Sequence, residues 1–435
     1  MDLLGKYRPI IKQTDPILRL GKVTRVVGIC AESLGPDVQV GEYCQIETFD
    51  GQGTIGAEVI GFRDGRILLM PLDDMDGIKQ GSLVIATGWP LRIRVGPDLL
   101  GRVIDGLGRP IDGKGPLVGP WQTINAASPD PLSREVIDEP LSMGIRAIDA
   151  TLTVGKGQRI GIFSGSGVGK STLVGMIARN CAADVKVIAL VGERGREVRE
   201  FLENQLGSCQ ETSVVVAATS DAPPLIRLKA GFTATTIAEY FRTQGADVLL
   251  IMDSVTRLAM AQREIGLSAG EPPTTRGYTP SMFSLLPKLM ERAGKAEQGS
   301  ITGIYTVLVE GDDFNEPVSD TARGILDGHI VLSRRLAEQG HFPAIDVLAS
   351  ISRLMPKLVT PEQLHDSRKL IKLLAAYREV EDLLQVGAYR KGNNSDTDLA
   401  VKMHDAINEF LQQDQNEAVS FERSIEELRD LLAGI

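Results

Sequence analysis

The stretch SGSGVGKS, Ser164 to Ser171, decides the fold of this chain. It lies between the apolar run Ile160 to Phe163 and a helix-like run that begins at Thr172. A strand, a glycine-rich turn and a helix N-terminus present backbone N–H groups and the positive end of a helix dipole to an anion. The sequence therefore predicts a phosphate-binding loop, in which Lys170 reaches the β- and γ-phosphates of a nucleotide and the Ser171 hydroxyl binds Mg²⁺. The candidate nucleotide-binding residues of the loop are Gly165, Ser166, Gly167, Val168, Gly169, Lys170, Ser171 and Thr172.

One position of the loop departs from the eight-residue pattern that defines such sites. The pattern opens with Gly, whereas this chain has Ser164 there, so the backbone freedom of glycine is absent at the start of the loop. Gly165, Gly167 and Gly169 keep the rest of the loop permissive. The alternative is an ordinary glycine-rich turn between a strand and a helix, and the residues downstream weigh against it.

A second motif places a carboxylate at the tip of an apolar run. Residues Val248 to Met252 are all apolar and are followed by Asp253. Nucleotide hydrolases hold Mg²⁺ through such a carboxylate as well as through the phosphate loop. Asp253 is therefore a candidate for the metal site, although the same pattern fits an Asp that caps the next helix.

A third motif is the apolar, strand-like run Val187 to Gly192, which ends at Glu193. A carboxylate at this place could polarise the water that attacks a phosphate. The alternative is a solvated helix face, on which Glu193 pairs with Arg194, Arg196 or Arg199. Because a solvated face would not normally begin at the tip of so apolar a strand, the active-site interpretation is favoured.

Length and composition limit the classes of protein to which the chain can belong. With 435 residues, 43% of them hydrophobic, two or three domains are expected. The 47 basic and 57 acidic residues give a net charge of −10, which argues against broad affinity for nucleic acid. The four Cys residues show no zinc-site or C-x-x-C spacing. No apolar run approaches the ~20 residues that cross a bilayer, and we expect a cytoplasmic protein.

Three segments resemble a known family. Gly192 to Glu197 resembles the Gly-Glu-Arg segment of the catalytic subunits of rotary ATPases, and Pro343 to Ser352 fits the alpha/beta signature of that superfamily without a mismatch. The stretch from Gly299 to Arg335 is similar to the ATPases of type III protein export. Within that group, DTARGILDGHIVLSR and the opening GKVTRVVGICAESLGP are more similar to the flagellar than to the injectisome ATPase. The resemblance covers nearly the whole chain.

The resemblance implies that four of these residues form one ATP site. Lys170 and Ser171 would bind phosphate and Mg²⁺, and Glu193 would activate the attacking water. Asp253 would hold the metal through water molecules. ATP and Mg²⁺ are the expected substrate and cofactor.

Four further residues receive roles from the resemblance alone. Arg194 matches a residue near the γ-phosphate, and Arg257 matches one that helps to position the catalytic carboxylate. Phe342 is similar to the aromatic residue that packs on adenine, although a core Phe fits its sequence context equally well. Arg353 matches the arginine finger, which reaches into the site of the neighbouring subunit. If that is its role, a monomer has no complete site and activity depends on assembly.

The expected architecture has four parts. Residues 1–19 form an N-terminal partner-binding segment. Short β-branched runs separated by Gly, Asp and Pro indicate a β-barrel domain over residues 20–95. Alternating strands and helices predict an α/β P-loop NTPase core, mostly parallel and RecA-like, over residues 96–355. Helical spacing of apolar residues predicts a C-terminal helical domain over residues 356–435.

The resemblance also implies partners. The chain would form a homo-hexameric ring, and its N-terminal segment would bind a regulatory protein unless it simply packs on the barrel. The stretch Ile265 to Tyr278, which is too broken by Gly and Pro for a regular element, would face the centre of the ring and contact a stalk-like export component. A plain surface loop is the alternative there. The remaining implied partners are export substrates or their chaperones. The resemblance also implies peripheral contact with an export gate at the inner membrane.

The leading hypothesis is a Mg²⁺-dependent ATPase that energises export of flagellar proteins through a type III apparatus. The nearest alternative is the injectisome ATPase. A non-catalytic nucleotide-binding subunit of a rotary ring should lack the carboxylate of Glu193. A hexameric nucleic-acid translocase is disfavoured by the acidic balance and by a barrel that is poor in aromatic residues.

Overall fold

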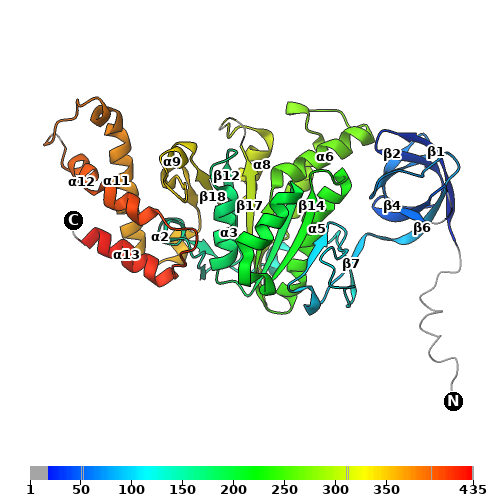
Figure 1. The fold of residues 1–435 in the computed structure, drawn as a ribbon, viewed down its shortest axis with the longest axis horizontal. Coiled ribbons are helices and arrows are strands. Elements are labelled where there is room, and N and C mark those ends of the chain that lie inside the picture. Colours follow the sequence, from blue (N-terminus) through cyan, green and yellow to red (C-terminus); the bar gives the residue numbers. More distant parts are fainter. Residues whose placement is uncertain are drawn as a thin grey trace, which may run out of the picture. The chain divides into compact units, whose positions relative to one another are not determined.

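The computed structural model describes residues 18–49, 51, 53–309, 311, 313–392 and 394–433 (Figure 1). The chain divides into two compact units. The barrel unit contains the chain up to Arg92 together with the short segments Pro223–Leu225 and Glu264–Pro272, and the main unit contains the rest. The predicted partner-binding segment, residues 1–19, lies almost wholly outside the described residues.

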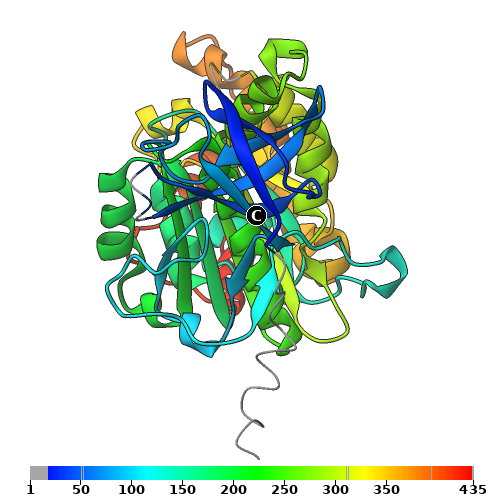
Figure 2. The ribbon, with the colours of Figure 1, turned by 90° about the vertical axis from the view of Figure 1, so that its right-hand side faces the viewer.

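Among the described residues of the barrel unit, six strands close a barrel in the order β1-β2-β5-β4-β3-β6 (blue in Figure 2). Their bounds are β1 Leu20–Val27, β2 Cys30–Leu34, β3 Glu42–Glu47, β4 Thr54–Arg63, β5 Arg66–Pro71 and β6 Leu83–Pro90. Side chains alternate between the interior and the outside, so that Cys44 and Ile46 of β3 are fully buried. A tight turn at Asp64-Gly65, with φ of 50° and 71°, joins β4 to β5. The predicted barrel is confirmed.

The main unit is built on a sheet with the strand order β19-β18-β12-β17-β15-β13-β14-β8. The bounds are β8 Val103–Asp105, β12 Arg159–Ser164, β13 Val185–Glu193, β14 Ser213–Thr219, β15 Asp247–Asp253, β17 Ser300–Leu308, β18 Gly328–Leu332 and β19 Ile351–Ser352. Every neighbouring pair from β18 to β8 is parallel, whereas β19 and the short β16 (Gly294–Lys295) pair antiparallel to β18 and β17. Strands β13 and β15 are buried along almost their whole length, as expected for strands covered on both faces.

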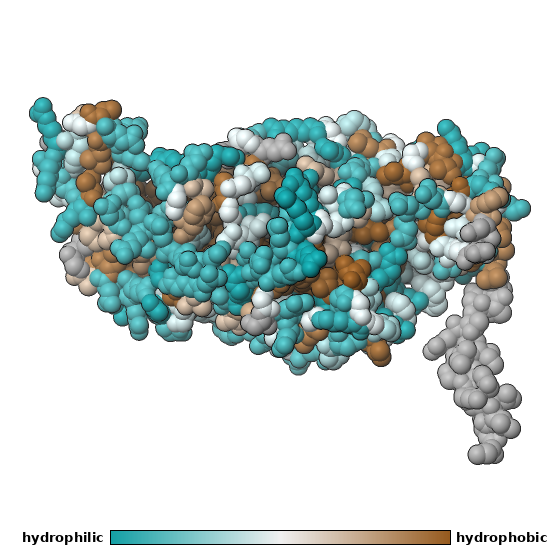
Figure 3. Space-filling model, in the orientation of Figure 1, coloured by the Kyte–Doolittle hydropathy of each residue, from teal (hydrophilic) through white to brown (hydrophobic). Residues whose placement is uncertain are grey.

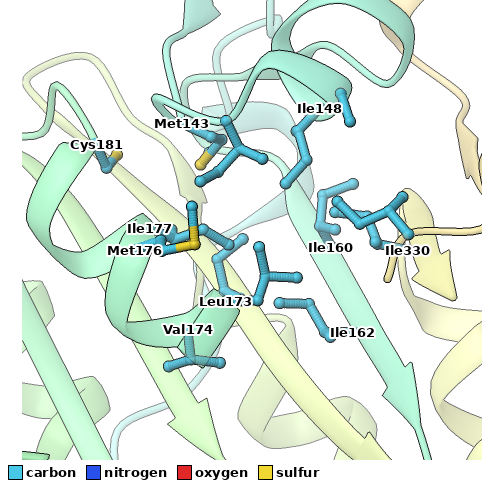
Figure 4. Packing of buried hydrophobic residues seen from close by; sticks show 14 of the residues in the cluster. Met143, Ile148, Ile160, Ile162, Leu173, Val174, Met176, Ile177, Cys181 and Ile330 are labelled. Carbon is cyan, nitrogen blue, oxygen red and sulfur yellow. The ribbon is translucent and has the colours of Figure 1, made fainter. Parts of the chain in front are cut away.

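The helices of the nucleotide-binding part follow the strands along the chain. They are α2 Arg146–Thr151, α3 Lys170–Asn180, α4 Gly195–Glu200, α5 Pro224–Thr243, α6 Val255–Ala269, α7 Pro280–Met290, α8 Pro317–Ile325 and α9 Arg334–Glu338. Figure 4 shows how α3 is fixed on the sheet, with Leu173 and Ile177 of the helix packed among Ile160 and Ile162 of β12. This packing sets the position of the loop that joins β12 to α3.

The C-terminal part is helical, as predicted, with α10 Met355–Leu358, α11 Pro361–Gln385, α12 Ser395–Leu411 and α13 Phe421–Ala433. Side chains of Thr360 and Asn394 cap the first turns of α11 and α12 by accepting backbone N–H bonds. Leu370, Ile407 and Leu428, one from each long helix, belong to the same buried cluster as the residues between α3 and β12. The helical domain and the nucleotide-binding sheet therefore share one hydrophobic core.

One expectation about the backbone is wrong in part. The stretch from Ile265 to Tyr278 was expected to lack regular structure, but α6 continues through Gly266 to Ala269. The helix ends at Gly270, whose φ of 90° is the left-handed conformation that commonly terminates helices. A single glycine inside a helix costs only about 1 kcal/mol, which the packing of the surrounding turns can offset.

The face of the main unit that Figure 3 shows is covered mostly by hydrophilic side chains. Among the helices that the structure describes, none combines the length and the apolar character needed to cross a membrane.

Candidate active site

The phosphate loop is held between a buried strand and a buried helix. Strand β12 ends at Ser164 and α3 begins at Lys170, with Ser166 and Gly167 exposed between them. Gly167 and Gly169 have φ of 80° and 91°, so the loop uses the left-handed backbone that glycine supplies. The backbone N–H groups and the first turn of α3 form the anion-binding arrangement that the sequence predicts.

Ser164 does not require the freedom of glycine. It is the last residue of β12 and is still paired with Leu308 of β17 and Leu332 of β18. Its backbone is therefore extended, a conformation that any residue adopts.

The tips of two neighbouring strands converge on the ammonium group of Lys170, and a third strand supports one of them. It contacts Oδ1 of Asp253, at the end of β15, and lies 3.6 Å from Oε1 of Glu193, at the end of β13. Thr306 of β17, which is buried, donates a 2.6 Å hydrogen bond to the same Oδ1 of Asp253. The structure thus brings together the lysine and both carboxylates that the sequence singled out. Thr306 was missed because a Thr inside an apolar strand carries no motif.

The electrostatics of this cluster suit a general base. Burial raises the pKa of Glu193 to about 7, and the negative charge of Asp253 adds to the rise while Lys170 opposes it. A carboxylate with a pKa near neutrality can both take up and release a proton at physiological pH.

The donor set also fits Mg²⁺. The ion prefers oxygen ligands and is usually held by one or two carboxylates together with substrate phosphates and water. The hydroxyl of Ser171 lies on the exposed first turn of α3, and the carboxylate of Asp253 lies beside the lysine. In the part of the chain that the structure describes, no group of three or more His, Cys, Asp or Glu residues could hold a metal by itself.

The two arginines near Glu193 differ in their surroundings. Arg257 of α6 packs across Gly192, where its side chain comes within 3.0 Å of the position that a Cβ would occupy. It therefore lies against the residue that precedes Glu193. The side chain of Arg194 is 70% exposed and pairs with Glu197 at 3.6 Å, so this structure does not bring it to the lysine.

Arg353 lies at the opposite end of the sheet from the phosphate loop. Strand β19 pairs Ser352 with Gly328 of β18, and Gly328 pairs with Ile160 near the start of β12. The loop leaves β12 at Ser164, four residues further on, which is about 13 Å along a strand. The exposed side chain of Arg353 is consequently far from the phosphate loop of its own chain.

A cavity of about 340 Å³ adjoins the phosphate loop. The ring of Phe342, which is 47% exposed, lies 3.5 Å from the position of a Cβ on Gly169. The cavity is lined by Gly169, Thr172, Leu173, Met176, Phe342, Pro343, Gln413, Asp414 and Gln415. Sequence reasoning found Phe342 and Thr172, gave Gln415 no firm role although the resemblance places it near adenine, and did not single out Gln413 or Asp414, since only the fold brings a connection between C-terminal helices to this place.

The chain matches known families in each part of the fold. Residues 23–88 match the beta-barrel domain of the ATP synthase alpha/beta family, residues 144–352 match its nucleotide-binding domain, and residues 359–430 match the T3SS EscN ATPase C-terminal domain. The flagellum-specific ATP synthase of Bacillus subtilis (strain 168) is 54% identical over 425 residues, which are 97% of each chain.

Two solved structures are also similar over most of the chain. The assembled ATPase EscN from the type III secretion system of enteropathogenic E. coli superposes with a TM-score of 0.90 at 49% identity, over 94% of this chain and 99% of that one. The structure of assembled EscN in complex with its central stalk EscO gives a TM-score of 0.88 at 48% identity, with the same coverage.

The barrel, the sheet with its phosphate loop and the helical domain therefore define a P-loop ATPase, and the predicted fold class is confirmed. The chain belongs to the ATP synthase alpha/beta family, in the branch of flagellum-specific ATP synthases and type III secretion ATPases.

Proposed function

We propose that this chain hydrolyses ATP with Mg²⁺ and thereby energises the export of flagellar proteins through a type III apparatus. The observation that carries the proposal is the contact of Lys170 with Asp253 and its approach to Glu193, beside a cavity of the size a base requires. The flagellar assignment is supported by the 54% identity to the flagellum-specific ATP synthase of Bacillus subtilis, whereas the type 3 secretion system ATPase of Xanthomonas euvesicatoria is 50% identical.

In this proposal each residue of the cluster has one task. Lys170 exchanges its carboxylate contacts for the β- and γ-phosphates, and Glu193 accepts a proton from the attacking water. Ser171 and Asp253 would hold Mg²⁺, which would supply positive charge that neutralises the phosphates. Thr306 keeps the carboxylate of Asp253 in its orientation through the 2.6 Å bond.

The base of ATP occupies the cavity next to the loop. The ring of Phe342 offers a flat apolar surface on which adenine can stack without base-specific hydrogen bonds. Arg257, packed on Gly192, holds the end of β13 and with it Glu193. Arg194 reaches the γ-phosphate only after it leaves Glu197.

The site is completed by a second copy of the chain in a homo-hexameric ring. The position of Arg353, at the opposite end of the sheet from its own phosphate loop, supports a role in the site of a neighbour. There its planar guanidinium stabilises the charge that develops on the transferred phosphoryl group.

Further partners are proposed from the relatives. EscN has been solved in complex with a central stalk, which supports a stalk-like export component as a partner. Contact with that component through residues 265–278 is proposed on the family resemblance alone. The regulatory partner of residues 1–19, export substrates or their chaperones, and the export gate at the inner membrane are proposed on the family resemblance alone. The chain would act in the cytoplasm at that gate, without a nucleic-acid partner.

The experiment that tests the enzymatic part measures Mg²⁺-dependent ATP hydrolysis against protein concentration, with the molecular mass followed in parallel. We expect the specific activity to rise as a larger species forms. Turnover by a monomer, independent of concentration, would contradict the shared site, and absence of turnover in the assembled ring would contradict an ATPase. Deleting the gene should abolish secretion of flagellar filament protein, whereas secretion that continues would contradict the flagellar assignment.

A further inference from the structure

The connection between α12 and α13 contains a buried glutamine. Residues 412–417, which we call the strap, form neither helix nor strand, and most of their side chains are exposed. Gln413 is the exception, because it is only 6% exposed. Through Gln413, Asp414 and Gln415 the strap forms one wall of the cavity that we assign to the base.

Gln413 is held by the nucleotide-binding part of the fold. Its Oε1 accepts a 2.8 Å hydrogen bond from the N–H of Arg146, and its Nε2 donates to the carbonyl oxygens of Gly144, at 2.9 Å, and Glu417, at 3.0 Å. Its own N–H donates a 3.0 Å bond to the carbonyl oxygen of Phe342. A buried amide that is satisfied at both polar atoms is costly to disturb.

The side chain of Arg146 binds the same segment. Its guanidinium donates to the carbonyl oxygens of Phe410, at 3.2 Å, and Gln412, at 2.8 Å. It also pairs with the carboxylates of Glu417, at 2.7 Å, and Glu427 of α13, at 2.6 Å. The side chain is 8% exposed, so this charge is compensated by four oxygen partners in a largely buried place.

The far end of α3 binds the strap as well. Arg179 donates a 2.7 Å bond to the carbonyl oxygen of Gln415, and Asn180 donates a 3.1 Å bond to that of Glu417. The wall of the cavity is therefore set by several anchors rather than by the exposed side chains of the strap.

We propose that Arg146 and Gln413 are positioning residues for the base of the nucleotide. They hold the strap against the cavity, and through Glu427 they make base affinity depend on the docking of α13. The inference rests on the proposed binding of ATP and adds the residues that set its affinity. The contacts of Arg146 and Gln413 run to the strap, to α13 and to the backbones of Gly144, Phe342 and Phe410. The phosphate site is built instead from Lys170 and its carboxylates. Their loss should weaken binding of the base and spare binding of the phosphates.

Binding of ADP and of inorganic tripolyphosphate, measured by calorimetry on the full chain, separates the two effects. In Arg146→Gln and Gln413→Ala we expect the Kd of ADP and the KM of ATP to rise about tenfold, with little change in kcat or in the Kd of tripolyphosphate. Glu427→Gln, which removes the charge of one half-buried partner of Arg146, should act in the same direction by a smaller factor. Arg335→Gln is the matched control, because it breaks an Arg–Glu pair between α9 and Glu381 of α11 that does not touch the strap.

Equal weakening of tripolyphosphate and ADP would overturn the proposal, since the variants would then act on the whole site. Unchanged ADP binding in Glu427→Gln and Gln413→Ala would overturn it as well. If Arg146→Gln does not fold, the ADP binding of Glu427→Gln and Gln413→Ala still tests the proposal. The binding measurements do not depend on turnover. A chain that binds ADP but does not hydrolyse ATP would contradict the proposed enzyme, and the role of the strap could still be measured in it.

Discussion

The hydroxyl of Thr306 donates a 2.6 Å hydrogen bond to Oδ1 of Asp253, the same oxygen that the ammonium group of Lys170 contacts. A residue of the central strand β17 thus orients a carboxylate that belongs to the neighbouring strand β15. Asp253 is buried, and these two donors hold the orientation of its carboxylate.

Replacing Thr306 by Val should lower ATP turnover by about tenfold, since a hydrogen bond to a charged group contributes about 1.5–3 kcal/mol. The measurement is kcat at saturating ATP and Mg²⁺. Thr302→Val is the matched control, because Thr302 lies on the same strand and accepts a 2.8 Å bond from the N–H of Gly157, away from the site. If both variants lose stability and turn over ATP at the same rate as each other, Thr306 has no role in orienting Asp253.

The pH profile should report the ionisation of Glu193. Burial raises its pKa to about 7 in the nucleotide-free protein, and only the ionised form can accept a proton. We expect kcat/KM to fall as the pH drops through 7, approaching about tenfold per pH unit. Glu193→Gln should bind ATP and lose turnover by about 100-fold or more. Its residual activity should lack this pH dependence, and a wild-type profile that stays flat to pH 5.5 would contradict the assignment of the base.

Arg353→Ala should fold and bind ATP but hydrolyse it about a thousandfold more slowly, the magnitude typical of arginine fingers. Mixing it with Lys170→Ala should restore activity, because a chain with an intact phosphate loop can then receive Arg353 from its neighbour. Arg368→Ala, which removes an exposed arginine of α11, serves as the control. A mixture no more active than its two components would refute a site shared between chains.

Ser164→Gly introduces the residue that is usual at the first position of the loop. We expect it to bring no improvement in ATP binding. Ser164 is paired within β12, and glycine in a strand loses more conformational freedom on folding, at a cost of about 0.5–1 kcal/mol. We expect a lower unfolding temperature and an unchanged KM for ATP. In Ser164→Ala, which keeps the Cβ and removes a buried hydroxyl that has no hydrogen-bond partner among the described residues, the unfolding temperature should not fall. A lower KM in the Gly variant would mean that the loop needs the freedom it lacks.

The parts of the candidate site that could be predicted are those whose chemistry leaves a local pattern. The glycines and Lys170 form a contiguous motif, and Glu193 and Asp253 each end an apolar run, so their places at strand tips follow from the sequence. Thr306 and Gln413 leave no such pattern, since a hydroxyl in a strand and an amide in a connection are common everywhere. The continuation of α6 through Gly266 was not predicted, because the local glycine and proline content indicates a loop. In the structure the helical turns before Gly266 continue through it.

The sequence by itself determined the phosphate loop, the alternation of strands and helices and the family to which the chain belongs, because these depend on residue types at fixed short spacings. Only the tertiary structure decided which residues meet. The strand order brings the tips of β13 and β15 to Lys170, sets Thr306 of β17 beside Asp253, and places Arg353 at the opposite end of the sheet from its own loop. The shared core of the helical domain brings Gln413 to the wall of the base cavity, more than two hundred residues from the loop in sequence. Contacts over such separations arise from the burial of whole apolar faces, a property that no single motif contains.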